Sequence, residues 1–196
     1  RSGRTIPRGQ CHGRNTMLDY QECDSERLDR QRRFYRLWLP DGPPQGVVVF
    51  VHGLGEHGGR YAAVAAELAS SGLAVYVPDL VGHGRSDGPR ASLRRFDLYL
   101  DEVEHLLDHT RVEHPQRPLF LIGQSMGGAV AGLLSERRRV PIDGLVLAAP
   151  AAKIPEDIFP WLRRLAGAAS ALVPWLRLVR IGGKRIAKRL VLAPMT

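Results

Sequence analysis

The sequence predicts an α/β fold with a mostly parallel sheet and helices on both faces. Two observations lead to this prediction. Short runs of Val, Leu and Ile, which suit strands buried on both faces of a parallel sheet, alternate with longer segments of helical periodicity. The chain has 196 residues, 44% of them hydrophobic, which is enough for one domain with a sizeable core.

The predicted elements follow each other in a regular order. A half-buried first strand is expected within residues 26–40, where the sequence alternates at Phe34, Arg36 and Trp38. Buried strands are predicted at residues 46–53, 73–80, 118–123 and 143–150. Helices are predicted at residues 60–72, 96–115 and 126–138. This alternation implies parallel strands that are joined by crossover helices.

The charge of the chain is uneven along its length. Its net value is +8, and the basic residues gather at the two ends. Residues 1–16 hold four arginines and residues 161–196 hold eight lysines and arginines, both without an acid. A basic, partly apolar end favours an anionic membrane surface or nucleic acid, and a solvated face is the other interpretation. Met17 is the first methionine, so residues 1–16 are predicted to be a disordered tail or sequence upstream of the true start.

Two further features bear on the cellular compartment. No run approaches the ~18 apolar residues of a membrane span, and the N-terminus lacks the apolar core of a signal peptide, so a cytoplasmic protein is expected. The two cysteines, Cys11 and Cys23, lie outside any strongly periodic segment. Their position argues against a disulfide scaffold or a cysteine metal site.

The segment HGLGEHGGR at residues 52–60 has the formal spacing of a nucleotide-binding motif. Its three glycines match a dinucleotide fingerprint between a strand and a helix, and Asp79 follows at the end of the next strand. Glu56, however, would place a carboxylate where the pyrophosphate must sit. The nucleotide interpretation is therefore kept only as a minor alternative.

The second glycine motif is Gly123-x-Ser125-x-Gly127, within FLIGQSMGGAV at a predicted strand-to-helix corner. At such a corner a nucleophile needs glycine two residues before it and two after it, because the backbone turn leaves no room for a Cβ. Ser125 is therefore the predicted nucleophile. The backbone N–H of Met126 would be one oxyanion donor and that of Leu54 the other. A small-residue corner formed only for packing is the alternative.

These residues resemble the α/β-hydrolases of the monoacylglycerol lipase and lysophospholipase type. HGLGEHGGRY resembles the oxyanion loop of that family, PDLVGHGRSDGPR the strand-loop segment after it, and GQSMGG the nucleophile elbow. The resemblance covers about residues 31–150 and departs from the family at Gln124, where His is common. It implies an α/β-hydrolase fold, Ser125 as the nucleophile, and the amides of Leu54 and Met126 as oxyanion donors. It implies no metal or cofactor.

The resemblance also implies a division of the chain. Residues 17–152 would form the N-terminal part of the hydrolase core, and residues 153–196 the start of a helical cap. The cap contains an amphipathic stretch at residues 156–180, which would touch a membrane peripherally. The residues predicted for this contact are Trp161, Arg163, Arg164 and Trp175. The predicted substrate is an acyl-ester lipid, and no nucleic-acid partner is expected.

The chain departs from the family most clearly after Ser125. In this fold the catalytic triad runs Ser, then Asp or Glu, then His, but no histidine follows His114. None of the downstream acids lies at the end of a later strand, whether Glu136, Asp143, Glu156 or Asp157. The sequence thus predicts an incomplete fold with an open sheet edge, in which the closing strands, the catalytic acid and the base are missing. Such a chain should react poorly by itself.

None of the earlier histidines is predicted to be the base. His52 and His83 lie in glycine-flanked loops that the family uses structurally, and His57 belongs to the oxyanion loop. His105 and His109 are four residues apart on a helix, a spacing that could hold a metal ion. Because they lie off the apolar face of that helix, we interpret them as a solvated surface.

The sequence therefore predicts a serine carboxylic-ester hydrolase. Its substrates would be monoacylglycerol or lysophospholipid-like esters, which react through an acyl-enzyme on Ser125. The alternative is a non-catalytic, membrane-surface binding protein with a degenerate hydrolase core, since the C-terminal end is both basic and apolar.

Overall fold

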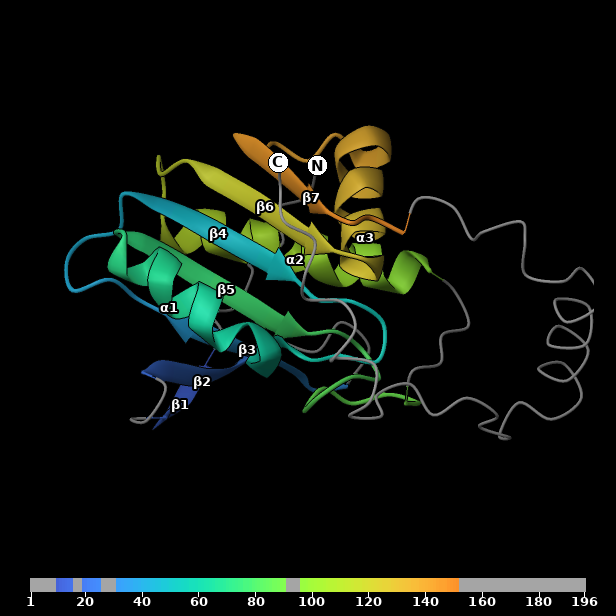
Figure 1. Cartoon of the computed structure of the whole chain (residues 1–196), viewed down its shortest axis with the longest axis horizontal. Coiled ribbons are helices and arrows are strands. Elements are labelled where there is room, and N and C mark those ends of the chain that lie inside the picture. Colours follow the sequence, from blue (N-terminus) through green and yellow to red (C-terminus); the bar gives the residue numbers. More distant parts are fainter. Residues whose placement is uncertain (1–9, 16–18, 26–30, 91–95, 152–196) are drawn as a thin grey trace, which may run out of the picture. The chain divides into compact units, whose positions relative to one another are not determined.

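A computed structural model of the chain describes residues 10–15, 19–25, 31–90 and 96–151. These residues form a seven-stranded sheet in the order β1-β2-β3-β5-β4-β6-β7 (Figure 1). Its strands are β1 (Gln10–Asn15), β2 (Tyr20–Ser25), β3 (Arg33–Trp38), β4 (Gly46–Val51), β5 (Leu73–Asp79), β6 (Leu119–Gln124) and β7 (Gly144–Ala148).

The half of the sheet from β5 to β7 is parallel. β4 pairs with β5 on one side and with β6 on the other, and β6 pairs with β7. The sequence GVVVFV of β4 is buried at every position, as expected for a strand that is covered on both faces. β3 joins antiparallel to β5, and β2 and β1 continue the sheet in antiparallel fashion. The predicted α/β class with a mostly parallel sheet is confirmed.

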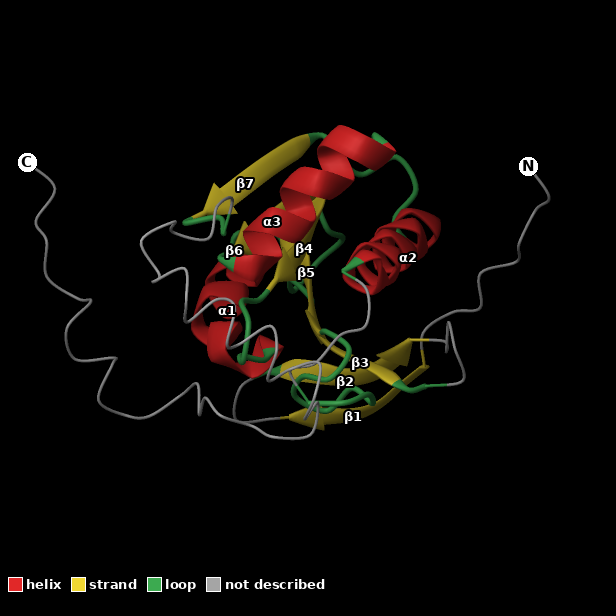
Figure 2. Ribbon diagram, turned by 90° about the vertical axis from the view of Figure 1, so that its right-hand side faces the viewer, coloured by secondary structure: helices red, strands yellow, loops and turns green. Residues whose placement is uncertain are grey.

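Helices cover both faces of the sheet (Figure 2). They are α1 (Ala62–Ser70), preceded by a 3₁₀ turn at Gly58–Tyr61, α2 (Asp97–Glu113), and α3 (Met126–Leu133), followed by a π-helical turn at Leu134–Arg138. The side chains of β6 alternate between the faces: Leu119 and Leu121 pack with α2 and α3, whereas Phe120 and Ile122 pack with α1. The helices predicted from the sequence are thus confirmed, with shifted ends.

The N-terminal hairpin of β1 and β2 differs from the prediction. The sequence predicted disorder or pre-start sequence for residues 1–16, but Gln10–Asn15 forms a strand, and no strand was predicted at Tyr20–Ser25. These strands lack alternating apolar residues, so their pairing with β3 defines them. The first predicted strand is confirmed in its second half, as β3.

The two cysteines form a disulfide across this hairpin. Cys11 on β1 lies opposite Cys23 on β2, with 3.9 Å between their Cα atoms. Cys11 is exposed, and Cys23 is fully buried in the core cluster that contains Tyr35. The sequence argued against a disulfide scaffold and did not predict this disulfide, because the strand register that brings the two residues together is not visible in their spacing.

β7 forms one edge of the described sheet. It pairs with β6 alone, and Leu145, Val146 and Leu147 are 37, 52 and 42% exposed, although the sequence predicted a buried strand. The described residues all belong to one compact unit, Arg1–Ala152. The predicted cap at residues 153–196, with Trp161, Arg163, Arg164 and Trp175, lies outside the described residues. Among the described helices, none has the length and apolarity needed to cross a membrane.

The hairpin disulfide yields a prediction for stability. Replacing both Cys11 and Cys23 by Ser should lower the free energy of unfolding by about 3 kcal/mol, because the bond closes a loop of roughly a dozen residues. Urea denaturation of the parent chain with and without reductant measures the effect. The double-serine variant is the control, since reductant should not shift its midpoint. An unchanged midpoint for the reduced parent chain would contradict the prediction.

Candidate active site

Ser125 lies at the corner between β6 and α3, as the residue between the last position of the strand and the first of the helix. Its backbone has φ 52° and ψ −114°, a conformation that costs a non-glycine residue about 1–3 kcal/mol. The surrounding backbone holds it there. Its N–H donates to the Ala148 carbonyl at 2.9 Å, and its carbonyl accepts from the N–H groups of Ala129 and Ala151. The strained corner therefore presents the half-buried serine side chain above the end of the sheet.

The glycines around Ser125 are required by close backbone contacts. A Cβ on Gly123 would lie 2.3 Å from the Gly127 carbonyl oxygen, and one on Gly127 would lie 2.2 Å from the Val51 carbonyl oxygen. Gly128 meets the backbone of Pro150 in the same way, at 2.9 Å. The start of α3 is thus pressed against the ends of β4 and β6, which no larger residue would allow.

The loop after β4 reaches the same corner. A Cβ on Gly53 would lie 3.3 Å from Ser125 Cβ and 2.6 Å from Gln124 Oε1, so the loop backbone runs beside the serine. Gly53 to Glu56 form a turn, in which the Glu56 N–H donates to the Gly53 carbonyl at 3.3 Å and Gly55 has a φ of +72°. The two glycine motifs of the sequence, some 70 residues apart, are therefore neighbours in space.

The predicted oxyanion donors come from these two elements. Met126 is the first residue of α3, so its N–H has no acceptor within the helix. Leu54 lies in the turn and is 44% exposed. For neither N–H do the described residues provide a hydrogen-bond acceptor. Both donors stay predictions, which the adjacency of Gly53 and Ser125 supports.

Asp79 at the end of β5 ties the surrounding loops together. It is fully buried, and its Oδ1 accepts from the Arg36 guanidinium at 2.6 Å and from the Gly58 N–H at 2.7 Å. Its Oδ2 accepts from the Arg85 N–H at 2.8 Å. The carboxylate is thus occupied by donors of the protein. The nucleotide interpretation, which needs this carboxylate for a ribose, finds no support.

Comparison with known proteins identifies the family. A family model described as serine aminopeptidase, S33 matches residues 42–192, which is most of the chain. The chain belongs to this family of α/β-hydrolases. The resemblance inferred from HGLGEHGGRY and GQSMGG is thereby confirmed.

Individual relatives agree with this assignment. A monoacylglycerol lipase from Mycolicibacterium smegmatis is 33% identical over 80% of this chain and 56% of its own length. The human monoglyceride lipase is 39% identical over 62% of this chain and 40% of its own length. The crystal structure of the Paleococcus ferrophilus monoacylglycerol lipase matches with a TM-score of 0.59 and 29% identity, over 75% of this chain and 53% of that one. The chain thus spans about half the length of the curated relatives it matches.

His52 supports the surrounding loops. It is fully buried, its Nε2 accepts from the Leu80 N–H at 3.0 Å, and its Nδ1 therefore carries the proton that goes to the Gly53 carbonyl at 2.8 Å. Burial lowers the pKa of His52 to about 4. His83 is also buried, its Nδ1 lies 3.0 Å from the Val81 carbonyl, and burial lowers its pKa. Both rings are neutral supports of the loops, as the sequence suggested.

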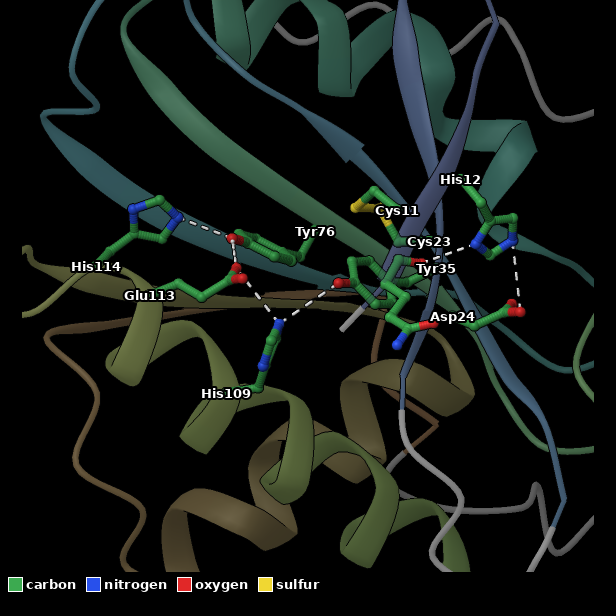
Figure 3. Close-up of a disulfide and its surroundings, with 10 residues drawn as sticks. Cys11, His12, Cys23, Asp24, Tyr35, Tyr76, His109, Glu113 and His114 are labelled. Atoms are coloured by element: carbon green, nitrogen blue, oxygen red, sulfur yellow. Dashed lines mark hydrogen bonds and ion pairs between the residues drawn. A yellow bond between two sulfur atoms is a disulfide. The ribbon is translucent and has the colours of Figure 1, made fainter. Parts of the chain in front are cut away.

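His109 contradicts the prediction of a solvated surface. It is 3% exposed and contacts Tyr35, with its Nε2 3.4 Å from the hydroxyl. The same nitrogen lies 3.3 Å from Glu113, which also accepts from the Tyr76 hydroxyl (Figure 3). The reason is that the buried face of α2 is wider than the stripe of its aliphatic residues, because tyrosines of β3 and β5 also cover the helix. His105 is partly buried, and the described residues contain no group of side chains suited to a metal ion.

No described residue serves as a base for Ser125. The serine hydroxyl has no hydrogen-bond partner among the described residues, and all histidines precede it in the sequence. Asp143 lies before the first residue of β7, at the end of the sheet away from Ser125, and accepts from the Leu119 N–H at 2.7 Å. Glu136 belongs to the π-helical turn. The remaining downstream acids, Glu156 and Asp157, lie outside the described residues.

Two glycines of α3 provide a matched test of the elbow. Gly127→Ala should lower the free energy of unfolding by more than about 2 kcal/mol, because its Cβ would meet the Val51 carbonyl oxygen. Gly132→Ala should instead raise it by up to about 1 kcal/mol, since the nearest atom is 4.0 Å away and alanine favours the helix. Urea denaturation measures both changes. Equal effects of the two substitutions would contradict the packing argument.

The burial of His52 predicts a pH dependence of stability. Because its pKa is about 4 in the folded chain and near 6.5 in an unfolded one, protonation favours unfolding. Its contribution of about 3 kcal/mol is fully present above pH 6.5 and is lost as the pH falls to about 4. NMR titration of the ring nitrogens should show the neutral Nδ1–H tautomer down to about pH 5. Half-protonation of His52 above pH 6 would contradict this prediction.

Proposed function

We propose that this α/β-hydrolase is a serine carboxylic-ester hydrolase with Ser125 as its nucleophile. The observation that carries the proposal is the strained backbone of Ser125, with φ 52°, directly beside the Gly53 turn. A strained conformation at the tip of a strand-turn-helix corner exposes a serine to substrate. The relatives named monoacylglycerol lipase and monoglyceride lipase support monoacylglycerols as the substrate class, and we propose lysophospholipid-like esters beside them.

The proposed chemistry follows from the two elements at the corner. Ser125 Oγ attacks the ester carbonyl carbon and transfers its proton to a base, and the oxyanion that forms accepts hydrogen bonds from the N–H groups of Leu54 and Met126. The tetrahedral intermediate collapses, and the alcohol leaves with a proton. Water then attacks the acyl-enzyme and releases the fatty acid and the free serine. No step requires a metal ion or an organic cofactor.

We further propose that the base and its acid partner come from sequence outside these 196 residues. In this fold they follow the nucleophile in the order Asp or Glu, then His, and no histidine follows Ser125 here. The length of the relatives supports this view, since the chain spans about half of them. The chain by itself would then hold the nucleophile and the oxyanion donors but turn over esters poorly.

The basic, apolar stretch at residues 161–196 favours peripheral contact with a membrane surface. It contains eight lysines and arginines and no acid, together with Trp161 and Trp175. Such contact would bring a cap close to its lipid substrate. A non-catalytic protein that only binds membrane surfaces is the second candidate function, and the labelling experiment below separates it from the first.

Labelling with a fluorophosphonate probe tests the nucleophile. The full-length gene product should be labelled and should hydrolyse monooleoylglycerol, whereas Ser125→Ala should abolish both. The 196-residue chain should be labelled at least about 100-fold more slowly, because general-base assistance contributes 10²–10⁴-fold. Equal labelling of the parent and Ser125→Ala proteins would refute the assignment. Absence of labelling and hydrolysis, with intact binding to anionic vesicles, would favour the second candidate.

A further inference from the structure

The side chains of Glu56 and Tyr61 connect the Gly53 turn to Gln124, the residue before the nucleophile. Glu56 Oε2 accepts from the Gly53 N–H at 3.2 Å and from the Tyr61 hydroxyl at 2.5 Å. The Tyr61 oxygen also lies 3.1 Å from Oε1 of Gln124, the neighbour of Ser125 in the chain. The loop after β4, the 3₁₀ turn before α1 and the end of β6 thus meet at one phenol.

The number of protons in this cluster determines which group donates in each hydrogen bond. Tyr61 has a single hydroxyl proton, and the shorter contact, to a carboxylate, takes it. Burial, and after it the hydrogen bond to Glu56, raises the pKa of Tyr61, which keeps the proton on the phenol. The contact with Gln124 is then satisfied only when the amide N–H donates to the phenol oxygen, a rotation of the amide by 180°. With the amide in that orientation, the hydrogen bonds run from Gln124 to Tyr61 and from Tyr61 to Glu56.

The end of this chain of hydrogen bonds lies at the candidate oxyanion turn. Gly53 is bound to Glu56 twice: its N–H donates to the side chain, and its carbonyl accepts from the Glu56 N–H at 3.3 Å. The peptide between Gly53 and Leu54 is the first of this turn, so its orientation sets the direction of the Leu54 N–H. Glu56 is held from its other oxygen by Arg60 at 3.5 Å. The Glu56 carboxylate thus anchors the N–H of Gly53, and the Glu56 main chain anchors its carbonyl. A shift of the carboxylate would act on the Leu54 N–H through Gly53.

We propose that Tyr61 is a positioning residue, which couples the nucleophile elbow through Gln124 to the oxyanion turn through Glu56. The proposal deepens the proposed function and rests on it. Gln124 fills a position where His is common in the resembling family, and an imidazole N–H there would make the same donation to the phenol.

Tyr61→Phe is the central variant of the test. The phenylalanine keeps the contact with the tilted ring of Phe50, whose centroid is 4.4 Å away, so the variant should fold. In the full-length gene product, kcat for monooleoylglycerol should fall about tenfold with KM changed less than about twofold, because the Leu54 N–H acts on the transition state. Gln124→Leu should behave alike, and Gln124→His should stay within about threefold of the parent.

Tyr76→Phe is the matched control. It also removes a buried hydroxyl that donates to a glutamate, Glu113 at 2.7 Å, but it lies outside the network. Its kcat should equal that of the parent even if its unfolding temperature falls. A kcat of Tyr61→Phe within twofold of the parent, or an equal loss in Tyr76→Phe, would overturn the proposal.

Amide hydrogen exchange of the 196-residue chain gives a second readout that does not depend on turnover. The Gly53 N–H should exchange at least about tenfold faster in Tyr61→Phe than in the parent, and should be unchanged in Tyr76→Phe. An unchanged rate in Tyr61→Phe overturns the positioning role. If Ser125→Ala hydrolyses the ester as fast as the parent, the proposed function is wrong, and the Gly53 exchange rates still decide whether Tyr61 holds the turn.

Discussion

The candidate site depends on the hydrogen bonds that the buried carboxylate of Asp79 accepts. This carboxylate sits at the end of β5 and binds Arg36 of β3, the Gly58 N–H before α1 and the Arg85 N–H of the following loop. A carboxylate away from water must be paired and hydrogen-bonded, so its donors have little freedom to move. Gly58 lies at the end of the loop that begins at Gly53. Asp79, more than twenty residues further along the chain, therefore anchors the loop that lies beside Ser125.

The antiparallel part of the sheet supports the same region from outside. Arg85 pairs with Glu22 of β2 at 2.6 Å and lies over the ring of Phe34, while Arg36 lies over Phe34 and Tyr20. β2 and β3 thus hold the two arginines that bind Asp79, Arg36 through its side chain and Arg85 through its main-chain N–H. The hairpin, which the sequence did not predict, belongs to the structural support of the candidate site rather than to a separate tail.

The parts that sequence patterns predicted are those in which local chemistry decides the outcome. The apolar runs of β4 and β6 suit only strands covered on both faces, and the spacing Gly123-x-Ser125-x-Gly127 suits a tight corner. The failures concern partners distant in sequence. His109 looked solvated because its burial depends on Tyr35 and Tyr76, and Cys11 looked unpaired because the register of a hairpin brings Cys23 to it.

The sequence by itself determined the order of the strands and helices from β3 to β7 and the corner at Ser125, since periodicity and glycine spacing act over a few residues. Its motifs also resemble those of the α/β-hydrolases. Only the tertiary structure decided that Gly53 lies against Ser125, that the Asp79 carboxylate is consumed by protein donors, and that Tyr61 joins Glu56 to Gln124. The physical reason is that hydrogen bonds and close contacts act over about 3 Å in space. The groups that meet at this distance come from strands which only the folded sheet places side by side.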